Sequence, residues 1–212
     1  PTTPPPTPQH SSAASDVYKR QGLLTFIVLF AAAYAAGSVN FSILAFRFAG
    51  RDDPRRHGSG NPGATNVFRQ AGLGWAAAVL LLDMGRAVGV ALVAQSLLPF
   101  WQVPWVGLGL ILGNRFPCFH GFKGGKGVAN YLGFTLAIAP VWAAVGALSW
   151  GAVHLIWRTP FLSSFAMVIM LAGGTTITLG TDWRTGVGAV VTALFIVACH
   201  HRNIRERWGG QK

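Results

Sequence analysis

Residues 73–98 read LGWAAAVLLLDMGRAVGVALVAQSLL, a run of 26 residues in which Asp83 and Arg86 are the only charged side chains. A helix that crosses the hydrocarbon core of a bilayer needs about 20 apolar residues. The run is therefore long enough to cross a membrane as one helix. Asp83 and Arg86 are three residues apart and share one helix face, which we expect to contact protein or water rather than lipid. The pair can support a functional site or simply pack the helix.

The composition of the whole chain agrees with a membrane protein. Hydrophobic residues make up 51% of the 212 residues and charged residues 11%, whereas soluble domains carry about 25% charged residues. The mean hydropathy is +0.43. The net charge of +11 could indicate nucleic-acid binding, but the basic residues lie at the ends of apolar runs and form no stripe with aromatic residues. We expect no nucleic-acid partner.

Seven apolar segments can be threaded through a membrane. They are residues 22–48, 73–98, 103–114, 128–138, 141–157, 161–179 and 186–199. The third and fourth are too short to cross unaided, which is tolerated where the backbone is buried in protein or lines a polar cavity. We predict an all-α, polytopic integral membrane protein with seven transmembrane helices in one domain, residues 22–212. Residues 1–21 lack an initiator Met and are expected to be a disordered or artefactual tail.

The cations are distributed unequally between the two sides of this threading. With the N-terminus outside, the outer side holds Arg184 and the tail residues Lys19 and Arg20. The inner loops and ends hold Arg47, Arg51, Arg55, Arg56, Arg69, Arg115, Lys123, Lys126, Arg158, Arg202, Arg205, Arg207 and Lys212. Because cytoplasmic loops carry an excess of Lys and Arg, we predict an external N-terminus, a cytoplasmic C-terminus and cytoplasmic glycine-rich loops.

The first of three polar segments, residues 57–69, reads HGSGNPGATNVFR. Its small residues let backbone N–H groups approach an anion, and its Ser, Thr and Asn side chains add hydrogen bonds. A helical turn after Pro62 would direct its positive end into the same space. A generic polar turn would explain the glycines and the proline, but not the density of donors that ends in Arg69. The segment predicts a phosphate site.

The second polar segment includes residues 121–127, GFKGGKG. It is not the nucleotide P-loop, which needs Ser or Thr after its Gly-Lys pair, because Gly127 follows Lys126. Lys123 and Lys126 on a glycine-rich backbone at a helix start can instead hold an anion without a metal ion. Taken alone, such a Lys/Gly junction is also a common topology signal.

The third polar segment begins with residues 200–205, HHRNIR, after the last apolar run. His200 and Asn203 are three residues apart, so both can point into one cavity. A single histidine at a helix end is more often a dipole or interface residue, but the other two segments favour a site here. The remaining histidines show no metal-ligand spacing and the chain has six carboxylates, so we expect no metal and no cofactor.

Together the three segments resemble the motifs of the bacterial acyl-phosphate-dependent glycerol-3-phosphate acyltransferases, the PlsY family. The matching stretches are GSGNPGATN with Arg69, FKGGKGVA from Phe122 to Ala129, and HHRNI from His200 to Ile204. The resemblance implies seven transmembrane helices in the bacterial inner membrane, with a cytoplasmic active site. It implies transfer of a fatty acyl group from acyl-phosphate to the sn-1 hydroxyl of glycerol 3-phosphate, giving lysophosphatidic acid and phosphate. The expected partners are these two substrates and membrane lipids, and the enzyme is expected to be a monomer.

The resemblance also implies roles for individual residues. The catalytic residues would be Ser59, Arg69, Lys126, His200 and Asn203. The substrate and phosphate contacts would come from Gly58, Gly60, Asn61, Gly63, Thr65, Asn66, Lys123, Gly124, Gly125 and Gly127. A mixed anhydride already has a good leaving group, so positioning and charge stabilisation are the main needs. Either His200 or the leaving phosphate could take the hydroxyl proton, and we favour the phosphate.

Two positions depart from the family pattern. Asn114 stands where the family often has His, and Phe161 stands at a frequent Ser, with Ser163 or Ser164 as possible substitutes. These departures leave room for a divergent homologue with reduced activity. A membrane transporter for phosphate esters would also explain a basic mouth and short helices. Against it, the polar segments share one face and no internal repeat is evident. Thioester acyltransferases and phosphatidyl-alcohol transferases need His-x-x-x-x-Asp pairs or several helix-borne Asp residues, which the chain lacks.

Overall fold

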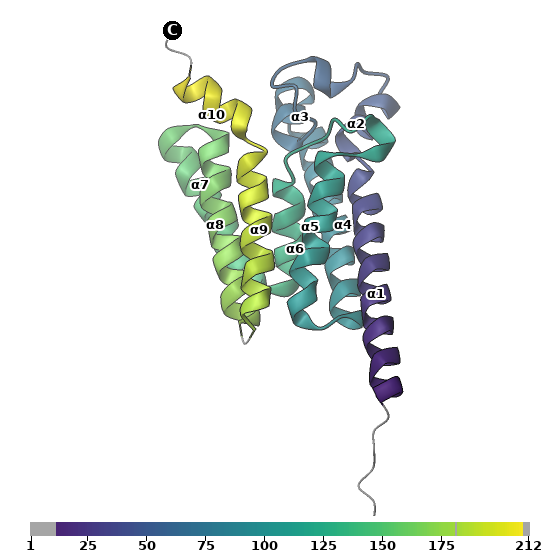
Figure 1. The fold of residues 1–212 in the computed structure, drawn as a ribbon. Coiled ribbons are helices and arrows are strands. Elements are labelled where there is room, and N and C mark those ends of the chain that lie inside the picture. Colours follow the sequence, from purple (N-terminus) through teal and green to yellow (C-terminus); the bar gives the residue numbers. More distant parts are fainter. Residues whose placement is uncertain (1–11, 181, 210–212) are drawn as a thin grey trace, which may run out of the picture.

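The computed structural model describes residues 12–180 and 182–209, which form α-helices and short 3-10 turns without a strand. The long helices run side by side in a bundle (Figure 1). They are α1 (Ser12–Ser38), α4 (Leu73–Leu97), α5 (Val103–Arg115), α6 (Val128–Ile138), α7 (Pro140–Trp157), α8 (Pro160–Leu179) and α9 (Trp183–Ala198). The 3-10 turns are η1 (Pro54–Arg56), η2 (Phe100–Gln102) and η3 (Cys118–His120).

Three short helices gather at one end of the bundle, which we call the polar end. They are α2 (Phe41–Phe48), α3 (Ala64–Ala71) and α10 (His201–Trp208). In Figure 1 all three lie at the top, while the described chain begins at the bottom. The polar segments predicted to share one face therefore lie at the same end of the bundle.

Length and apolarity identify four described segments that could cross a membrane: Lys19–Phe48, Leu73–Leu97, Pro140–Trp157 and Pro160–Leu179. A fifth is possible if α9 and α10, which meet at an angle of 49°, count as one bent span. Helices α5 and α6 have only 13 and 11 residues. Large apolar side chains such as Leu81, Leu148 and Leu155 are exposed on the outside of the bundle, as expected for a surface that faces lipid.

The predicted first span, residues 22–48, falls within the candidate span Lys19–Phe48, but two helices form it rather than one. Helix α1 already runs from Ser12, within the expected tail, and ends at Ser38, and α2 begins at Phe41. The Asn40 side chain caps α2 by accepting a hydrogen bond from the Ile43 N–H (3.0 Å), and its amide donates to the Pro62 carbonyl (3.4 Å). The break therefore ties the first membrane segment to the first polar segment. Residues 1–11 of the expected tail lie outside the described residues.

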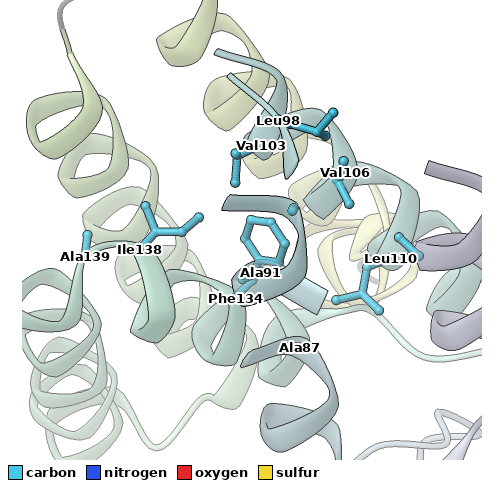
Figure 2. Close-up of a cluster of buried hydrophobic side chains, with 11 residues drawn as sticks. Ala87, Ala91, Leu98, Val103, Val106, Leu110, Phe134, Ile138 and Ala139 are labelled. Carbon is cyan, nitrogen blue, oxygen red and sulfur yellow. The ribbon is translucent and has the colours of Figure 1, made fainter. Parts of the chain in front are cut away.

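Helices α1 and α5 are in close contact because glycines face backbone across their interface. A Cβ atom at Gly113 would overlap the Tyr34 carbonyl oxygen, and one at Gly37 would overlap the Leu110 carbonyl oxygen. Small residues that allow backbones to approach are typical of helix pairs in membranes. Next to this contact, Figure 2 shows Leu98, Val103, Val106, Leu110 and Phe134 in the main hydrophobic cluster, formed mainly by α4, α5 and α6. The bundle therefore has an apolar core beneath its polar end.

Candidate active site

A cavity of about 400 Å³ opens at the polar end and extends between the helices. Residues from all three polar segments line it. The predicted site residues among them are Ser59, Asn61, Gly63, Thr65, Asn66, Arg69, Gly125, Lys126, Gly127, His200 and Asn203. Gly58, Gly60, Lys123 and Gly124, which were also predicted, do not line it. Segments far apart in the sequence therefore meet in one cavity.

The loop that carries Ser59 is held by a buried amide. The Asn66 side chain, 1% exposed, accepts a hydrogen bond from the Ser59 N–H (3.0 Å) and donates to the carbonyls of Pro54 (2.9 Å) and His57 (3.2 Å). Gly58 has φ +62°, and a Cβ atom there would overlap the Asn66 side-chain oxygen. Only glycine adopts this conformation readily. Asn66 and Gly58 therefore position Ser59 at the cavity.

Helix α3 starts at the cavity wall. Gly63 caps it without a side-chain hydrogen bond, and Gly63 and Thr65 line the cavity. The first N–H groups of a helix have no partner within the helix and carry its positive end. Arg69 lies one turn after Thr65 and also lines the cavity. The start of α3 therefore offers N–H groups to an anion, as the sequence predicted for the turn after Pro62, and Arg69 in the last turn of α3 adds a guanidinium to the cavity lining.

The glycines of the second segment pack against the end of α5. The Gly124 N–H donates to the Arg115 carbonyl (3.1 Å) and the Gly125 N–H donates to the Asn114 carbonyl (2.9 Å). A Cβ atom at Gly124 would overlap the Asn114 carbonyl oxygen. These two N–H groups are therefore engaged within the protein. The Lys123 side chain is exposed and outside the cavity, so Lys126 is the lysine of this segment that faces it.

Lys126 and Asn203 join the second and third segments. The Lys126 ammonium donates a hydrogen bond to the Asn203 side-chain oxygen. Burial lowers the pKa of Lys126 from 10.5 to about 8, because the charged form loses solvation in the cavity. An incoming anion would restore the lost charge stabilisation. Lys126 is thus a cation placed where an anionic ligand would stabilise it.

His200 lies at the break between α9 and α10, where it is the N-cap residue of α10. Its Nδ1 atom lies 2.8 Å from the Ile196 carbonyl oxygen. A carbonyl only accepts hydrogen bonds, so Nδ1 carries the proton and Nε2 keeps its lone pair in the neutral ring. Burial, and next the charge of Lys126, lower the pKa of His200 from 6.5 to about 4. The ring is therefore a neutral hydrogen-bond acceptor at pH 7.

The three-residue spacing of His200 and Asn203 predicts that both side chains point into one cavity, if they lie on one continuous helix. The chain instead bends between α9 and α10, and both residues still line the cavity. The bend begins where the His200 N–H donates to the Val197 carbonyl (2.9 Å), a tighter turn than in α9.

An ion pair in the bundle supports the cavity floor. Arg86 donates to Asp83 (2.7 Å) and to the Asn130 side-chain oxygen (2.6 Å). Both of those bonds come from Nη2, and the second terminal nitrogen, Nη1, donates to the Ala36 carbonyl (3.0 Å) and the Val39 carbonyl. Asp83 and Asn130 line the cavity. The sequence did not decide whether the Asp83–Arg86 pair supports a site or only packs the helix. In the structure the pair links α4 and α6 to the end of α1 beneath the site.

Sequence reasoning missed Asn130 as a cavity residue. The available signal was one amide inside the otherwise apolar run 128–138, since a polar side chain in a membrane helix usually faces protein or a cavity. Of the departures from the family pattern, Asn114, Phe161 and Ser164 line the cavity, whereas Ser163 does not. Ser163 is fully buried, and its hydroxyl donates to the Thr159 carbonyl (3.2 Å).

Away from the polar end the cavity becomes apolar. Its lining there includes Leu80 of α4, Leu132 of α6, Ala147 and Trp150 of α7 and Met167 of α8. This part can take a hydrocarbon chain, while the polar part holds cations and hydrogen-bond donors. One cavity therefore suits a ligand with a fatty chain and a phosphate group.

Comparisons with known proteins agree with a cavity that has one polar and one apolar part. Residues 27–210 match the family model described as glycerol-3-phosphate acyltransferase. The chain is 40% identical over 183 residues to a glycerol-3-phosphate acyltransferase of Thioalkalivibrio sulfidiphilus, covering 85% of this chain and 89% of that one. It is 39% identical over 186 residues to the enzyme of that name from Nitrosospira multiformis, covering 85% and 92%.

Two solved structures have the same fold. Both are crystal structures of PlsY (YgiH), an integral membrane glycerol 3-phosphate acyltransferase. The glycerol 3-phosphate form superposes with a TM-score of 0.81 at 33% identity, covering 89% of this chain and 94% of that one. The lysophosphatidic acid form gives a TM-score of 0.79 at 32% identity, with the same coverage.

Proposed function

The chain belongs to the glycerol-3-phosphate acyltransferase family, and we propose from that premise that acyl-phosphate is its acyl donor. It is an integral membrane acyltransferase of phospholipid biosynthesis. In the proposed reaction the sn-1 hydroxyl of glycerol 3-phosphate attacks the acyl carbon, and the bond from that carbon to the phosphate oxygen breaks. The products are lysophosphatidic acid and phosphate. The relatives solved with glycerol 3-phosphate and with lysophosphatidic acid support this choice of substrate and product.

The observation that carries the proposal is the meeting of the three polar segments with an apolar arm in one cavity. Lys126 and Arg69 are cations from different segments, and the start of α3 adds N–H groups. Two phosphates repel each other, so two cations and a helix N-terminus that hold them together lower the barrier to reaction. Ser59, positioned by Asn66, adds a hydroxyl beside them. We also propose that the protein acts as a monomer.

We assign the hydroxyl proton to the leaving phosphate. His200 is a poor base at pH 7, because burial lowers its pKa to about 4. The phosphate that leaves the acyl carbon gains the electron pair of the broken carbon–oxygen bond and carries an extra negative charge until it is protonated, so it is the better acceptor. The lone pair on His200 Nε2 instead accepts a hydrogen bond from the sn-2 hydroxyl and so orients the glycerol, while the sn-1 hydroxyl gives its proton to the phosphate. His200→Ala should then weaken glycerol 3-phosphate binding about tenfold, as for the loss of one hydrogen bond, while single-turnover acyl transfer at saturating substrate persists. Complete loss of that single turnover would make His200 the base.

We also propose the membrane arrangement. The long helices α1, α4, α5, α6, α7, α8 and α9 cross the bacterial inner membrane, with the N-terminus outside and the polar end in the cytoplasm. The cation distribution of the loops supports this orientation. The short α5 and α6 are supported by their buried contacts, since both contribute to the core cluster. Cysteine labelling from each side of right-side-out and inverted vesicles, at Cys118 and at an introduced Trp183→Cys, tests it.

The donor is tested with the purified full-length protein and labelled glycerol 3-phosphate. Palmitoyl-phosphate and palmitoyl-CoA are supplied separately, and the labelled lipid product is counted. Ester formed from palmitoyl-phosphate alone is the expected result. Ester formed equally well from palmitoyl-CoA would contradict the donor assignment, and a Lys126→Ala sample is the background control.

A further inference from the structure

A second hollow lies at the polar end, outside the cavity described above. It measures about 610 Å³ and is lined by Ile43 and Arg47 of α2, by Arg51, by Asp53 and Arg55 around η1, and by Phe119, His120 and Gly121 around η3. It shares no lining residue with the acyl-transfer cavity. Three guanidinium groups and an exposed phenyl ring therefore surround a space that the acyl transfer does not use.

The wall of this hollow is fixed by Arg55. Its Nε and Nη2 atoms donate to the Asp53 carboxylate (2.9 and 2.6 Å), and its Nη1 donates to the carbonyls of His120 (2.7 Å) and Lys123 (3.0 Å). Asp53 is thereby neutralised and η1 is tied to the η3 loop. The neighbouring Asp52 faces His57, with 3.6 Å between carboxylate and ring nitrogen. Neither acid is paired with Arg47 or Arg51.

Arg47 and Arg51 are therefore uncompensated cations. In the described part of the chain the Arg47 side chain has no hydrogen-bond or ion-pair partner, and Arg51 donates only to the Gln70 carbonyl (3.1 Å). Burial lowers the pKa of His120 most, and the charge of Arg55 lowers it further. The charge of Asp53 raises this pKa, but Arg55 and Arg47 together outweigh it, so the local field is positive. An anion with more than one oxygen would fit between these groups.

The surroundings point to a membrane source for that anion. Arg47 and Phe48 end the segment Lys19–Phe48, which is apolar and long enough to cross a membrane. In a membrane they would lie near the point where the chain leaves the hydrocarbon. Phe48 is 86% exposed, Phe119 62% and Phe122 59%. Phe122 holds its backbone at φ +57°, an unusual conformation for a residue other than glycine, with its N–H donating to the Pro117 carbonyl (2.9 Å). Exposed phenylalanines beside arginines suit a surface that meets lipid, because the rings can contact acyl chains while the guanidinium groups attract anionic headgroups.

We propose that this hollow binds the phosphate headgroup of an anionic membrane lipid, held by Arg47 and Arg51 with Phe119 against its glycerol and acyl region. The site would orient the polar end against the anionic leaflet. It goes beyond the acyl transfer and does not depend on the donor or on turnover.

The test measures lipid retention by the full-length protein purified in neutral detergent. Native mass spectrometry counts bound dioleoyl phosphatidylglycerol and, separately, bound dioleoyl phosphatidylcholine. We expect one phosphatidylglycerol to be retained in preference to phosphatidylcholine. The Arg47→Gln/Arg51→Gln variant should lose that preference by roughly 30-fold, since each basic residue at an anionic surface contributes about fivefold.

The matched control is Arg205→Gln/Arg207→Gln, which removes the same charge from exposed positions of α10 at the same end. It should retain phosphatidylglycerol like the unmodified protein. Arg47→Glu is a second variant that disturbs no hydrogen bond and should repel the headgroup. Equal retention of the two lipids, an unchanged preference in the Arg47 variants, or an equal loss in the control would each overturn the proposal. Displacement of the lipid by millimolar inorganic phosphate alone would reassign the site to a free anion and overturn the lipid assignment.

Discussion

The two glycine-rich loops beside the cavity have similar compositions but different reasons for their glycines. In the Ser59 loop, Gly58 adopts a positive φ so that the chain can fold around the Asn66 amide. In the Lys126 loop, Gly124 and Gly125 use their lack of a side chain to press against the end of α5. The first loop is organised by a side chain and the second by backbone contact. Their sensitivity to substitution should differ accordingly.

The largest expected effect is that of Gly124→Ala. Its Cβ atom would overlap the Asn114 carbonyl, where only backbone could move away, so we expect a loss of about 3 kcal/mol or more in the free energy of unfolding. Gly121→Ala, in the same loop, meets open space at φ +66° and should cost about 1 to 2 kcal/mol. Thermal unfolding in detergent compares the two variants. A loss for Gly124→Ala no larger than that for Gly121→Ala would show that the close approach of Gly124 to the Asn114 carbonyl does not constrain the loop.

The next effect separates the two lysines of that loop. Lys126→Ala removes the cation that faces the cavity, and we expect kcat/KM to fall by about 100-fold or more, as for other preorganised charge donors. Lys123→Ala removes an exposed lysine outside the cavity, and the change should stay below about threefold. Initial rates with palmitoyl-phosphate provide the measurement. A comparable loss in both variants would mean that Lys123 also reaches the phosphates.

Asn66→Ala tests the organisation of the other loop. It leaves the Ser59 N–H without its partner, and we expect a loss of about 1 to 3 kcal/mol in stability together with a lower kcat. The matched variant is Gln70→Ala, because the Gln70 amide donates to the same carbonyls of Pro54 (3.1 Å) and His57 (3.2 Å) but does not contact Ser59. Gln70→Ala should lower stability less and leave kcat unchanged. If both variants lower kcat equally, Asn66 has no special role in placing Ser59.

Much of the fold could be predicted from the sequence, because bilayer thickness limits helix length and Gly or Pro interrupts the apolar runs. The predictions for α4, α5, α6, α7 and α8 agree with the structure to within one residue at each end. The break after Ser38 was not predicted, although Asn40 is a residue type that commonly caps the start of a helix. The break depends on two distant residues. The Arg86 guanidinium donates to the Ala36 carbonyl of α1, and the Pro62 carbonyl accepts a hydrogen bond from the Asn40 side chain.

The candidate site was predicted at the level of segments rather than of side chains. The motifs indicate that three polar segments supply an anion site, and the structure places them in one cavity. The spacing of residues does not predict which lysine of a Gly-Lys loop faces the cavity. That depends on how Gly124 and Gly125 pack on α5. The same holds for Asn66, whose side chain resembles a ligand donor in the sequence but is occupied by the loop itself.

The smallest effect, a pH dependence, again distinguishes the two loops, because only the Lys126 loop carries a titrating cation at the cavity. Burial lowers the pKa of Lys126 to about 8, so the ammonium is charged below pH 8 and neutral above it. The glycerol 3-phosphate dianion does not titrate there, since its second pKa is about 6. KM for glycerol 3-phosphate should therefore rise about tenfold between pH 7 and pH 9.

Stability should move in the opposite direction. Between pH 8 and 10.5 the unfolded chain binds a proton at Lys126 that the folded protein does not, so the free energy of unfolding rises with pH in that window. Lys126→Arg keeps its charge throughout, and it should flatten both profiles. A KM that still rises between pH 7 and pH 9 in the arginine variant would place the titrating group elsewhere than in the Lys126 loop.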